Sequence, residues 1–210
     1  MARYTQANCR LCRRVGDKLM LKGERCFTSK CALERRTVPP GYNATSKRRS
    51  KKSDRGVQLH EKQKARHSYG ILERQFRKIF AEAERIPGVT GDNLLILLER
   101  RLDNVVYRLG FASSRDQARQ LVRHGHLLVN ERRADIPSYL IRPGDVITWR
   151  ESGTKTEYYK TLVQEIGDRV VPNWLALEKD KMTGKVLSLP EPADIEAKFD
   201  AKVIVEYYSR

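Results

Sequence analysis

The sequence has no long hydrophobic run. Its longest uninterrupted apolar stretch is Leu94–Leu98, whereas a membrane-spanning helix needs about 20 apolar residues. Nor does an apolar segment follow the first residues, MARY, as a secretory signal would require. A membrane-embedded or secreted protein is therefore not expected, and the cytosol is the expected compartment.

Aromatic residues are few, and no internal repeat is visible. Phe, Trp and Tyr make up 8% of the chain, whereas charged residues make up 32%. This balance predicts a small core, with much of the chain spread over another molecule. No pattern recurs at a period of about 20–50 residues, which argues against a solenoid or propeller.

Acidic residues are scarce in the first part of the chain. Residues 1–78 contain 22 Lys and Arg against 6 Asp and Glu, so this part alone carries the whole formal charge of +16. The remainder is neutral overall. Such a segregated basic region favours a polyanionic partner, because each phosphate that is neutralised releases condensed counterions.

Cysteine is absent after position 31. The four cysteines, Cys9, Cys12, Cys26 and Cys31, have the spacing C-x2-C-x13-C-x4-C. Two close pairs separated by a loop fit a tetrahedral thiolate site, and their segment has too few apolar residues for a core of its own. Disulfides are disfavoured in the cytosol. Structural zinc is the preferred interpretation, and an iron–sulfur cluster is the alternative.

A breaker-rich, basic segment and a basic helical region follow the cysteines. The segment TVPPGYNATSKRRSKKSD, residues 37–54, includes the polybasic pair Arg48 and Arg49. Like charges repel, so such a run is expected to order only against nucleic acid. From residue 58 to Pro87 the apolar residues recur at helical spacing.

Residues 100–130 are the most informative stretch of the chain. Apolar spacing predicts one helix over residues 93–109 and a second that begins at an S-x-x-Q capping box, Ser114–Gln117. On the second helix the spacing of Arg115, Arg119 and Arg123 places them on one face, away from the apolar stripe. The alternative is an ordinary solvated face, but the heavily basic chain favours a row of arginines that binds phosphates.

The sequence pattern changes from helix to strand after residue 126. Strands are predicted over residues 127–130, 132–135, 146–149 and 184–189, with a helix over residues 158–166. The terminal run KVIVEYY, residues 202–208, is β-branched and aromatic and is predicted to be extended.

One long motif resembles a known family. LERRLDNVVYRLGFASSRDQARQLVRHGHLLVN, followed by RPGDVI, is similar to the RNA-binding domain of the small-subunit ribosomal protein four (S-four) family. The motifs ARY, CRLCRR, LKGERC, CALERR, PPG, LHEKQKAR, YGILERQFRKIF and VEYYSR occur in the order expected for bacterial members, and the cysteines resemble the metal-binding branch. The departures are PPGYNA in place of PPGQHG, Glu131 in place of glycine, and Pro192 in place of arginine.

The resemblance implies an α+β fold in three parts. A cysteine-rich metal module with a basic arm would occupy residues 1–45. A basic helical domain would occupy residues 46–92 and include the C-terminal return, residues 190–210. An S-four-type RNA-binding domain, with helices packed on a small antiparallel sheet, would occupy residues 93–189.

The resemblance also implies a function: a structural component of the small ribosomal subunit, bound to the ribosome in the cytoplasm. It would be a primary ribosomal RNA binder that nucleates assembly of the subunit body and supports decoding accuracy. Its implied partners are that RNA, ribosomal protein five of the same subunit and messenger RNA near the entry path, without a membrane or a small-molecule substrate. The expected RNA contacts are Arg48, Arg49, Lys62, Lys64, Arg66, Arg101, Arg115, Arg119, Arg123, His124 and His126.

No arrangement of residues suited to catalysis is visible. The sequence shows neither paired carboxylates nor a Ser–His or Cys–His combination placed for chemistry. Asp103 follows an arginine in a helical stretch and is expected to form an ion pair with a neighbouring arginine. A cysteine-rich DNA regulator would need a helix after the second cysteine pair, and ERRTVPP breaks the chain too early. We therefore expect an RNA-binding protein that is not an enzyme.

Overall fold

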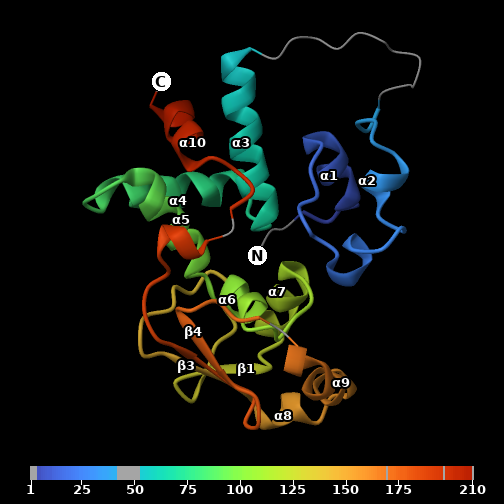
Figure 1. Ribbon diagram of the computed structural model, residues 1–210. Coiled ribbons are helices and arrows are strands. Elements are labelled where there is room, and N and C mark those ends of the chain that lie inside the picture. The colour runs from blue at the N-terminus through green and yellow to red at the C-terminus, as the bar shows by residue number, and fades with distance from the viewer. Residues whose placement is uncertain (1–3, 42–52, 169, 196, 210) are drawn as a thin grey trace. The chain divides into compact units, whose positions relative to one another are not determined.

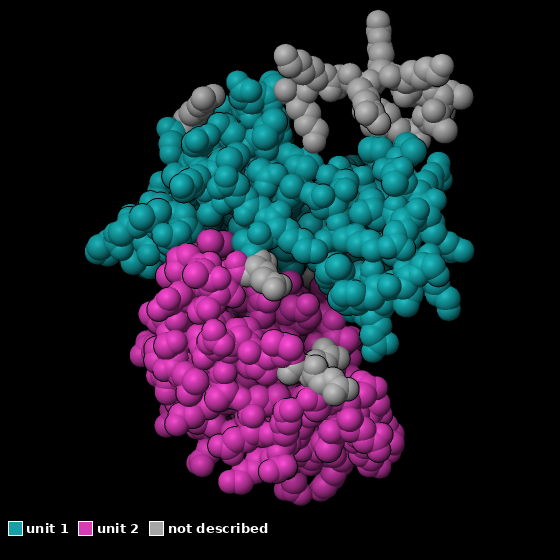
Figure 2. Space-filling view, in the orientation of Figure 1, with its two compact units in different colours: residues 1–94, 196–210 teal, residues 95–195 magenta. Residues whose placement is uncertain are grey.

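The computed structural model divides into two compact units, which Figure 2 colours separately. Unit 1 comprises residues 1–94 and 196–210, and unit 2 comprises residues 95–195. The structure describes residues 4–41, 53–168, 170–195 and 197–209. Within these ranges no helix is both long enough and apolar enough to cross a membrane.

Unit 1 is helical. Its elements are α1 (Cys9–Val15), η1 (Gly23–Cys26), α2 (Ala32–Arg35), α3 (Asp54–Ser68), α4 (Glu73–Arg85), the first half of α5 (Thr90–Glu99) and α10 (Ala201–Tyr208). Helix α3 begins where the Ser53 hydroxyl accepts a hydrogen bond from the backbone N–H of Gly56. Helix α4 buries Phe76, Phe80 and Ala83 along one face, as its apolar spacing predicts.

The predicted extended segment at the C-terminus is wrong, because residues 201–208 form helix α10 (Figure 1). The Asp200 carboxylate caps this helix at the backbone N–H of Lys202. Ile204 is buried, and the ring of Tyr208, one turn later, stacks on Phe80 with 4.3 Å between ring centroids. Packing on one helical face therefore outweighs the weak β preference of the isolated residues.

The single helix predicted over residues 93–109 is interrupted. Helix α5 ends at Glu99, and α6 (Leu102–Arg108) starts after Arg101, whose backbone is extended and forms an isolated bridge with Leu140. The backbone N–H of Leu102 donates to a carbonyl of the same distant segment. These hydrogen bonds to a distant segment replace the helical hydrogen bonds. They cannot be predicted from the spacing of apolar residues.

Unit 2 is built on a five-stranded antiparallel sheet of order β2-β1-β3-β5-β4. The strands are β1 (Leu127–Val129), β2 (Arg132–Arg133), β3 (Val146–Trp149), β4 (Leu175–Glu178) and β5 (Thr183–Val186). The remaining elements are α7 (Arg115–Arg123), α8 (Glu151–Thr154), α9 (Glu157–Glu165), η2 (Ile166–Asp168) and η3 (Pro192–Asp194). The four predicted strands and the predicted helix near residue 158 are confirmed, with ends shifted by a few residues. Strand β4 was not predicted.

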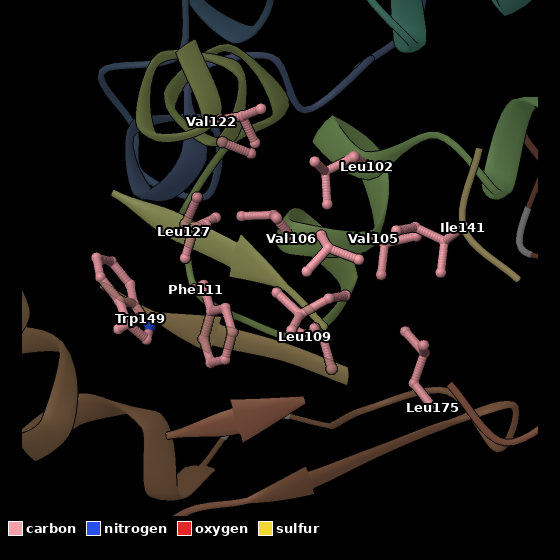
Figure 3. Packing of buried hydrophobic residues seen from close by; sticks show 14 of the residues in the cluster. Leu102, Val105, Val106, Leu109, Phe111, Val122, Leu127, Ile141, Trp149 and Leu175 are labelled. Carbon is pink, nitrogen blue, oxygen red and sulfur yellow. The ribbon is translucent and has the colours of Figure 1, made fainter. Parts of the chain in front are cut away.

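The core of unit 2 lies between α6, α7 and the sheet (Figure 3). Helix α6 contributes Leu102, Val105 and Val106, which are fully buried, and Val122 and Leu127 join them from α7 and β1. Burying each such side chain contributes about 1.5–3 kcal/mol relative to leaving it exposed. This packing fixes α6 and α7 on the sheet, so their polar faces have set orientations.

The hairpin between β1 and β2 places two non-glycine residues in left-handed backbone. Asn130 has φ 49° and Glu131 has φ 64°, as a two-residue turn with positive φ at both central positions requires. The Asn130 side chain supports the turn, because it donates to the Asp145 carboxylate and accepts from the backbone N–H of Val146. Glu131 has no such hydrogen bond in the described structure.

Replacing Glu131 by glycine is expected to stabilise unit 2 by about 0.5–1 kcal/mol, because glycine adopts positive φ without a steric penalty. Trp149 and Trp174 are the only tryptophans and both are buried in unit 2, so urea unfolding followed by their fluorescence measures the change. Glu131→Ala, which keeps the Cβ, is the control and should give no gain. A loss of stability in the glycine variant would contradict the assignment of strain.

Candidate nucleic-acid interface and cysteine cluster

The start of α7 orients the candidate RNA-binding residues. The Ser114 hydroxyl accepts from the backbone N–H of Gln117 at 3.3 Å, and the Gln117 side chain accepts from the backbone N–H of Ser113 at 2.9 Å. The predicted cap at Ser114 is confirmed, with the return bond one residue earlier than in the standard capping box. Because Ala118 and Val122 point into the core, the rotation of α7 is fixed.

The three α7 arginines do not form one exposed row. Arg123 is exposed and Arg115 is half-buried, but Arg119 is only 7% exposed. The predicted position away from the buried face is therefore wrong for Arg119. Its guanidinium turns inward because the carboxylate of Asp103, on the adjacent helix α6, lies within reach.

Asp103 binds two buried arginines. Its Oδ1 and Oδ2 accept from Nε and Nη2 of Arg101 at 3.1 and 2.8 Å, and its Oδ2 also accepts from Nε and Nη2 of Arg119 at 3.1 and 2.8 Å. The expected ion pair of Asp103 with a neighbouring arginine is confirmed. Arg101 is 2% exposed and Asp103 is 3% exposed. These buried ion pairs hold the segment just before α6 against α7.

A second buried carboxylate positions Arg115. The carboxylate of Glu99, which is 1% exposed, accepts from the side-chain amide of Asn104 at 2.7 Å and from Arg108 at 2.8 Å. The other end of the Asn104 amide accepts from Nε of Arg115 at 2.7 Å, and that guanidinium lies 4.7 Å from the ring centroid of Tyr107. Sequence reasoning missed this chain of contacts. The one feature of the sequence that could have predicted these contacts is the presence of polar residues within strongly apolar helices.

Several exposed basic side chains lie where α7 ends. Arg123 and His124 are exposed, and the rings of His124 and His126 lie 5.9 Å apart. A Cβ on Gly125 would clash with the Arg133 guanidinium, so that side chain crosses the turn from strand β2. Burial, together with His124, lowers the pKa of His126. We call Arg123, His124, His126 and Arg133 the α7-end surface. Arg133 was not predicted to belong to it.

The predicted RNA contacts in unit 1 are largely engaged within the protein. Lys62 is buried and its ammonium lies 2.7 Å from the Glu73 carboxylate and 4.8 Å from the ring centroid of Tyr207. Lys62 faces Tyr207 because α3 packs against α10, and Glu73 is the first residue of the next helix, α4. This arrangement argues against a direct RNA contact for Lys62.

The other two predicted cations of α3 are partly exposed. Lys64 lies 2.8 Å from Asp17 and 2.9 Å from Glu61; burial lowers its pKa, but these two carboxylates outweigh burial and raise it. Arg66 donates to Gln63 at 2.8 Å. Their RNA contacts stay predictions, and Arg48 and Arg49 lie outside the described residues.

The four cysteines are free thiols, and all of them lie within residues 9–31 of unit 1. Cys26 and Cys31 are buried, and the Cys26 sulfur accepts a hydrogen bond from the backbone N–H of Lys22 at 3.3 Å. Burial raises the pKa of Cys12, and a backbone hydrogen bond from Leu19 opposes this rise. The charges of the other three thiols raise it further.

This donor set fits a thiolate-bound ion in chemistry and spacing. Four sulfurs, of which those of Cys12 and Cys26 accept backbone N–H hydrogen bonds, suit zinc or an iron–sulfur cluster. In the described part of the chain, however, no three Cys, His, Asp or Glu side chains are already arranged as a metal site. The predicted metal-binding extension is therefore not shown by the structure.

Comparison with known proteins finds relatives that match the chain over its whole length. Residues 3–99 match the description "Ribosomal protein S4/S9 N-terminal domain", and residues 100–147 match "S4 domain". Small ribosomal subunit protein uS4 of Dehalococcoides mccartyi (strain CBDB1) is 57% identical over 210 residues, which cover all of both chains. Those of Pelotomaculum thermopropionicum (strain DSM 13744 / JCM 10971 / SI) and Geobacter sp. (strain M21) are 56% and 54% identical over the same length. The chain belongs to the uS4 family.

The family assignment confirms the resemblance to the S-four family that the sequence motifs indicated. It also locates the boundary between the two matched regions. In this uS4 member the two matched regions meet between Glu99 and Arg100, where the helix is interrupted before α6. Of the three departures, Glu131 keeps the positive φ that glycine would allow. Pro192 starts the short helix η3, and the PPGYNA loop is described only as far as Gly41.

Proposed function

We propose that this uS4 protein is a structural component of the small ribosomal subunit, where it binds ribosomal RNA in the cytoplasm and has no catalytic role. The observation that carries the proposal is identity above 50%, from end to end, with proteins named as small ribosomal subunit proteins. The net charge of +16 supports a nucleic acid as the principal partner.

The α7-end surface supplies accessible basic side chains, Arg123 and Arg133 among them, for docking onto folded RNA. The major groove of duplex RNA excludes side chains, so recognition there depends on shape, phosphates and 2′-hydroxyls. An arginine such as Arg123 suits this task because its planar guanidinium can bind two phosphate oxygens at once. The buried carboxylates Glu99 and Asp103 hold α6 and α7 in place, so the surface is formed before RNA binds. Arg101 and Arg119 then serve RNA binding chiefly by maintaining this geometry.

The proposal extends to the role of the protein within the subunit. A preformed basic surface can bind RNA before neighbouring proteins arrive, which supports a primary binder that nucleates assembly of the subunit body. Ribosomal protein five and messenger RNA near its entry path are the proposed neighbours, with an influence on decoding accuracy.

A structural metal completes the proposal. Cys9, Cys12, Cys26 and Cys31 would hold zinc, which would supply the folding free energy that the small apolar content of their segment lacks. Elemental analysis of the purified protein tests the choice of metal. One zinc per chain and a colourless protein support it, whereas a brown protein with iron and labile sulfide would assign an iron–sulfur cluster instead.

RNA binding tests the proposed function directly. The affinity for a small-subunit ribosomal RNA fragment should fall steeply with salt, and Arg123→Gln should weaken binding by about 1 kcal/mol and reduce the salt slope by about 1. Lys155→Gln removes the same charge at an exposed position paired with Glu151, so it should bind like the wild type. A salt slope near zero for the wild type would refute the proposed docking.

A further inference from the structure

A pocket in unit 1 lies between the cysteine-rich segment and α3. Its volume is about 420 Å³, within the range of about 300–1,000 Å³ that is typical of small-molecule sites. Arg10 and Arg14 line it from α1, and His60, Arg66 and His67 line it from α3. The described residues that line it include no Asp or Glu.

The positive charge in this pocket is largely uncompensated. Among the described residues, neither Arg10 nor Arg14 has an ion-pair partner. Arg66 donates to Gln63 and forms a long ion pair with the Glu73 carboxylate, 3.7 Å from its Nε and without a hydrogen bond, so its charge is partly offset from outside the pocket. Lys62, on the same helix as Arg66, has a carboxylate at 2.7 Å. Three guanidiniums in a pocket without an acid form a site for an anion.

One of the two pocket histidines, His67, reports the positive charge of the pocket. Burial and the charges of Arg66 and Arg14 lower the pKa of His67 to about 4, against an opposing effect of Glu73. The ring of His67 is therefore neutral at pH 7 and lies within reach of two guanidinium charges. The ring of His60 is held in place by the carbonyl of Val15, 2.8 Å from Nε2.

Most of the remaining wall is apolar, although Gln6 and Gln63 also line the pocket. Tyr4, Leu11, Val15, Pro40 and Leu59 line the pocket beside the arginines. A site for phosphate alone has no need of such a wall, whereas an unpaired nucleotide offers both a phosphate for arginines and a flat base for apolar or aromatic side chains.

We propose that this pocket binds one unpaired nucleotide of the RNA, with the phosphate among Arg10, Arg14 and Arg66 and the base against the apolar wall. The inference rests on the proposed RNA-binding function and adds a site for a single nucleotide within it. A free nucleoside monophosphate has the same chemistry and serves as the probe.

Histidine NMR signals test the proposal in the full-length protein. The chain has four histidines, of which His60 and His67 line the pocket, whereas His124 and His126 lie in unit 2. Adding uridine 5′-monophosphate at constant ionic strength should shift the two pocket signals with saturation. It should also raise the pKa of His67, because the phosphate offsets the guanidinium charges. Equal, unsaturated shifts of all four histidines, or no shift of the pocket pair, would overturn the proposal.

Two further comparisons sharpen this test. Inorganic phosphate should bind at least fivefold more weakly than the nucleotide, and equal affinities would refute the assignment of a nucleotide. Arg10→Gln and Arg14→Gln should each weaken nucleotide binding at least fivefold. The matched variant Arg35→Gln, exposed on α2 of the same segment, should not. If all three variants bind alike, the pocket is not the site.

Binding to ribosomal RNA separates this inference from the proposed function. If Arg10→Gln and Arg14→Gln bind the RNA fragment as tightly as the wild type while Arg123→Gln is weakened, the pocket proposal fails and the proposed function stands. If the wild type does not bind the fragment, the proposed function fails. A several-fold loss in the two pocket variants, with wild-type binding by Arg35→Gln, supports the pocket.

Discussion

Replacing Asp103 by asparagine is expected to destabilise unit 2 by about 3–5 kcal/mol, because the change removes the carboxylate charge that the buried guanidiniums of Arg101 and Arg119 share. Both guanidiniums currently donate to this one carboxylate. An asparagine of the same shape offers a single neutral acceptor oxygen, so most of the charge-assisted hydrogen bonding is lost. Urea unfolding followed by tryptophan fluorescence measures the effect, since both tryptophans lie in unit 2.

Asp135→Asn is the matched control for this experiment. Asp135 is exposed and its nearest cation, Arg133, is 4.0 Å away, so an equal loss of charge there should change the stability of unit 2 by less than about 0.5 kcal/mol. The double variant Asp103→Asn with Arg119→Gln should lose less than the sum of the two single variants, because the partners share one interaction. Additive losses, or an Asp103→Asn variant as stable as the control, would show that the buried cluster does not hold α6 and α7.

Patterns confined to a few neighbouring residues could be predicted from the sequence. The cap at Ser114 and the strand that includes Val146 depend on local spacing, and both appear in the structure. The interruption at Arg101 and helix α10 depend on residues far away in the chain. The first is set by backbone bonds to residues near Leu140, and the second by the packing of Tyr208 on Phe80.

The candidate site shows the same limit at the level of side chains. Helical spacing places Arg115, Arg119 and Arg123 on one side of α7, but spacing cannot show that a buried carboxylate on α6 draws Arg119 inward. Lys62 is a similar case, since Glu73 lies on the next helix. The sequence thus predicted which segments are basic. The positions of the acidic side chains in the fold decide which basic side chains can bind a phosphate, and the sequence does not show these positions.

Removing the proposed metal is expected to unfold the cysteine-rich segment and leave unit 2 folded. The buried aliphatic side chains of that segment are few, Leu11, Val15 and Leu19 among the described residues. In small zinc modules, metal binding supplies about 10–16 kcal/mol of free energy that is also folding free energy. Without the metal, the apolar contacts that remain are too few to offset the conformational entropy of the segment.

Trypsin digestion with and without a chelator measures this loss. Residues 10–36 contain nine Lys and Arg, and these should be protected with zinc and cleaved rapidly without it, while the tryptophan fluorescence of unit 2 stays constant. Cys26→Ser should be cleaved rapidly even with zinc present, whereas Ser29→Ala, an exposed position in the same segment, should behave like the wild type. Equal cleavage of the wild type in both conditions would show that the segment folds without a metal, and the four thiols would then need another explanation.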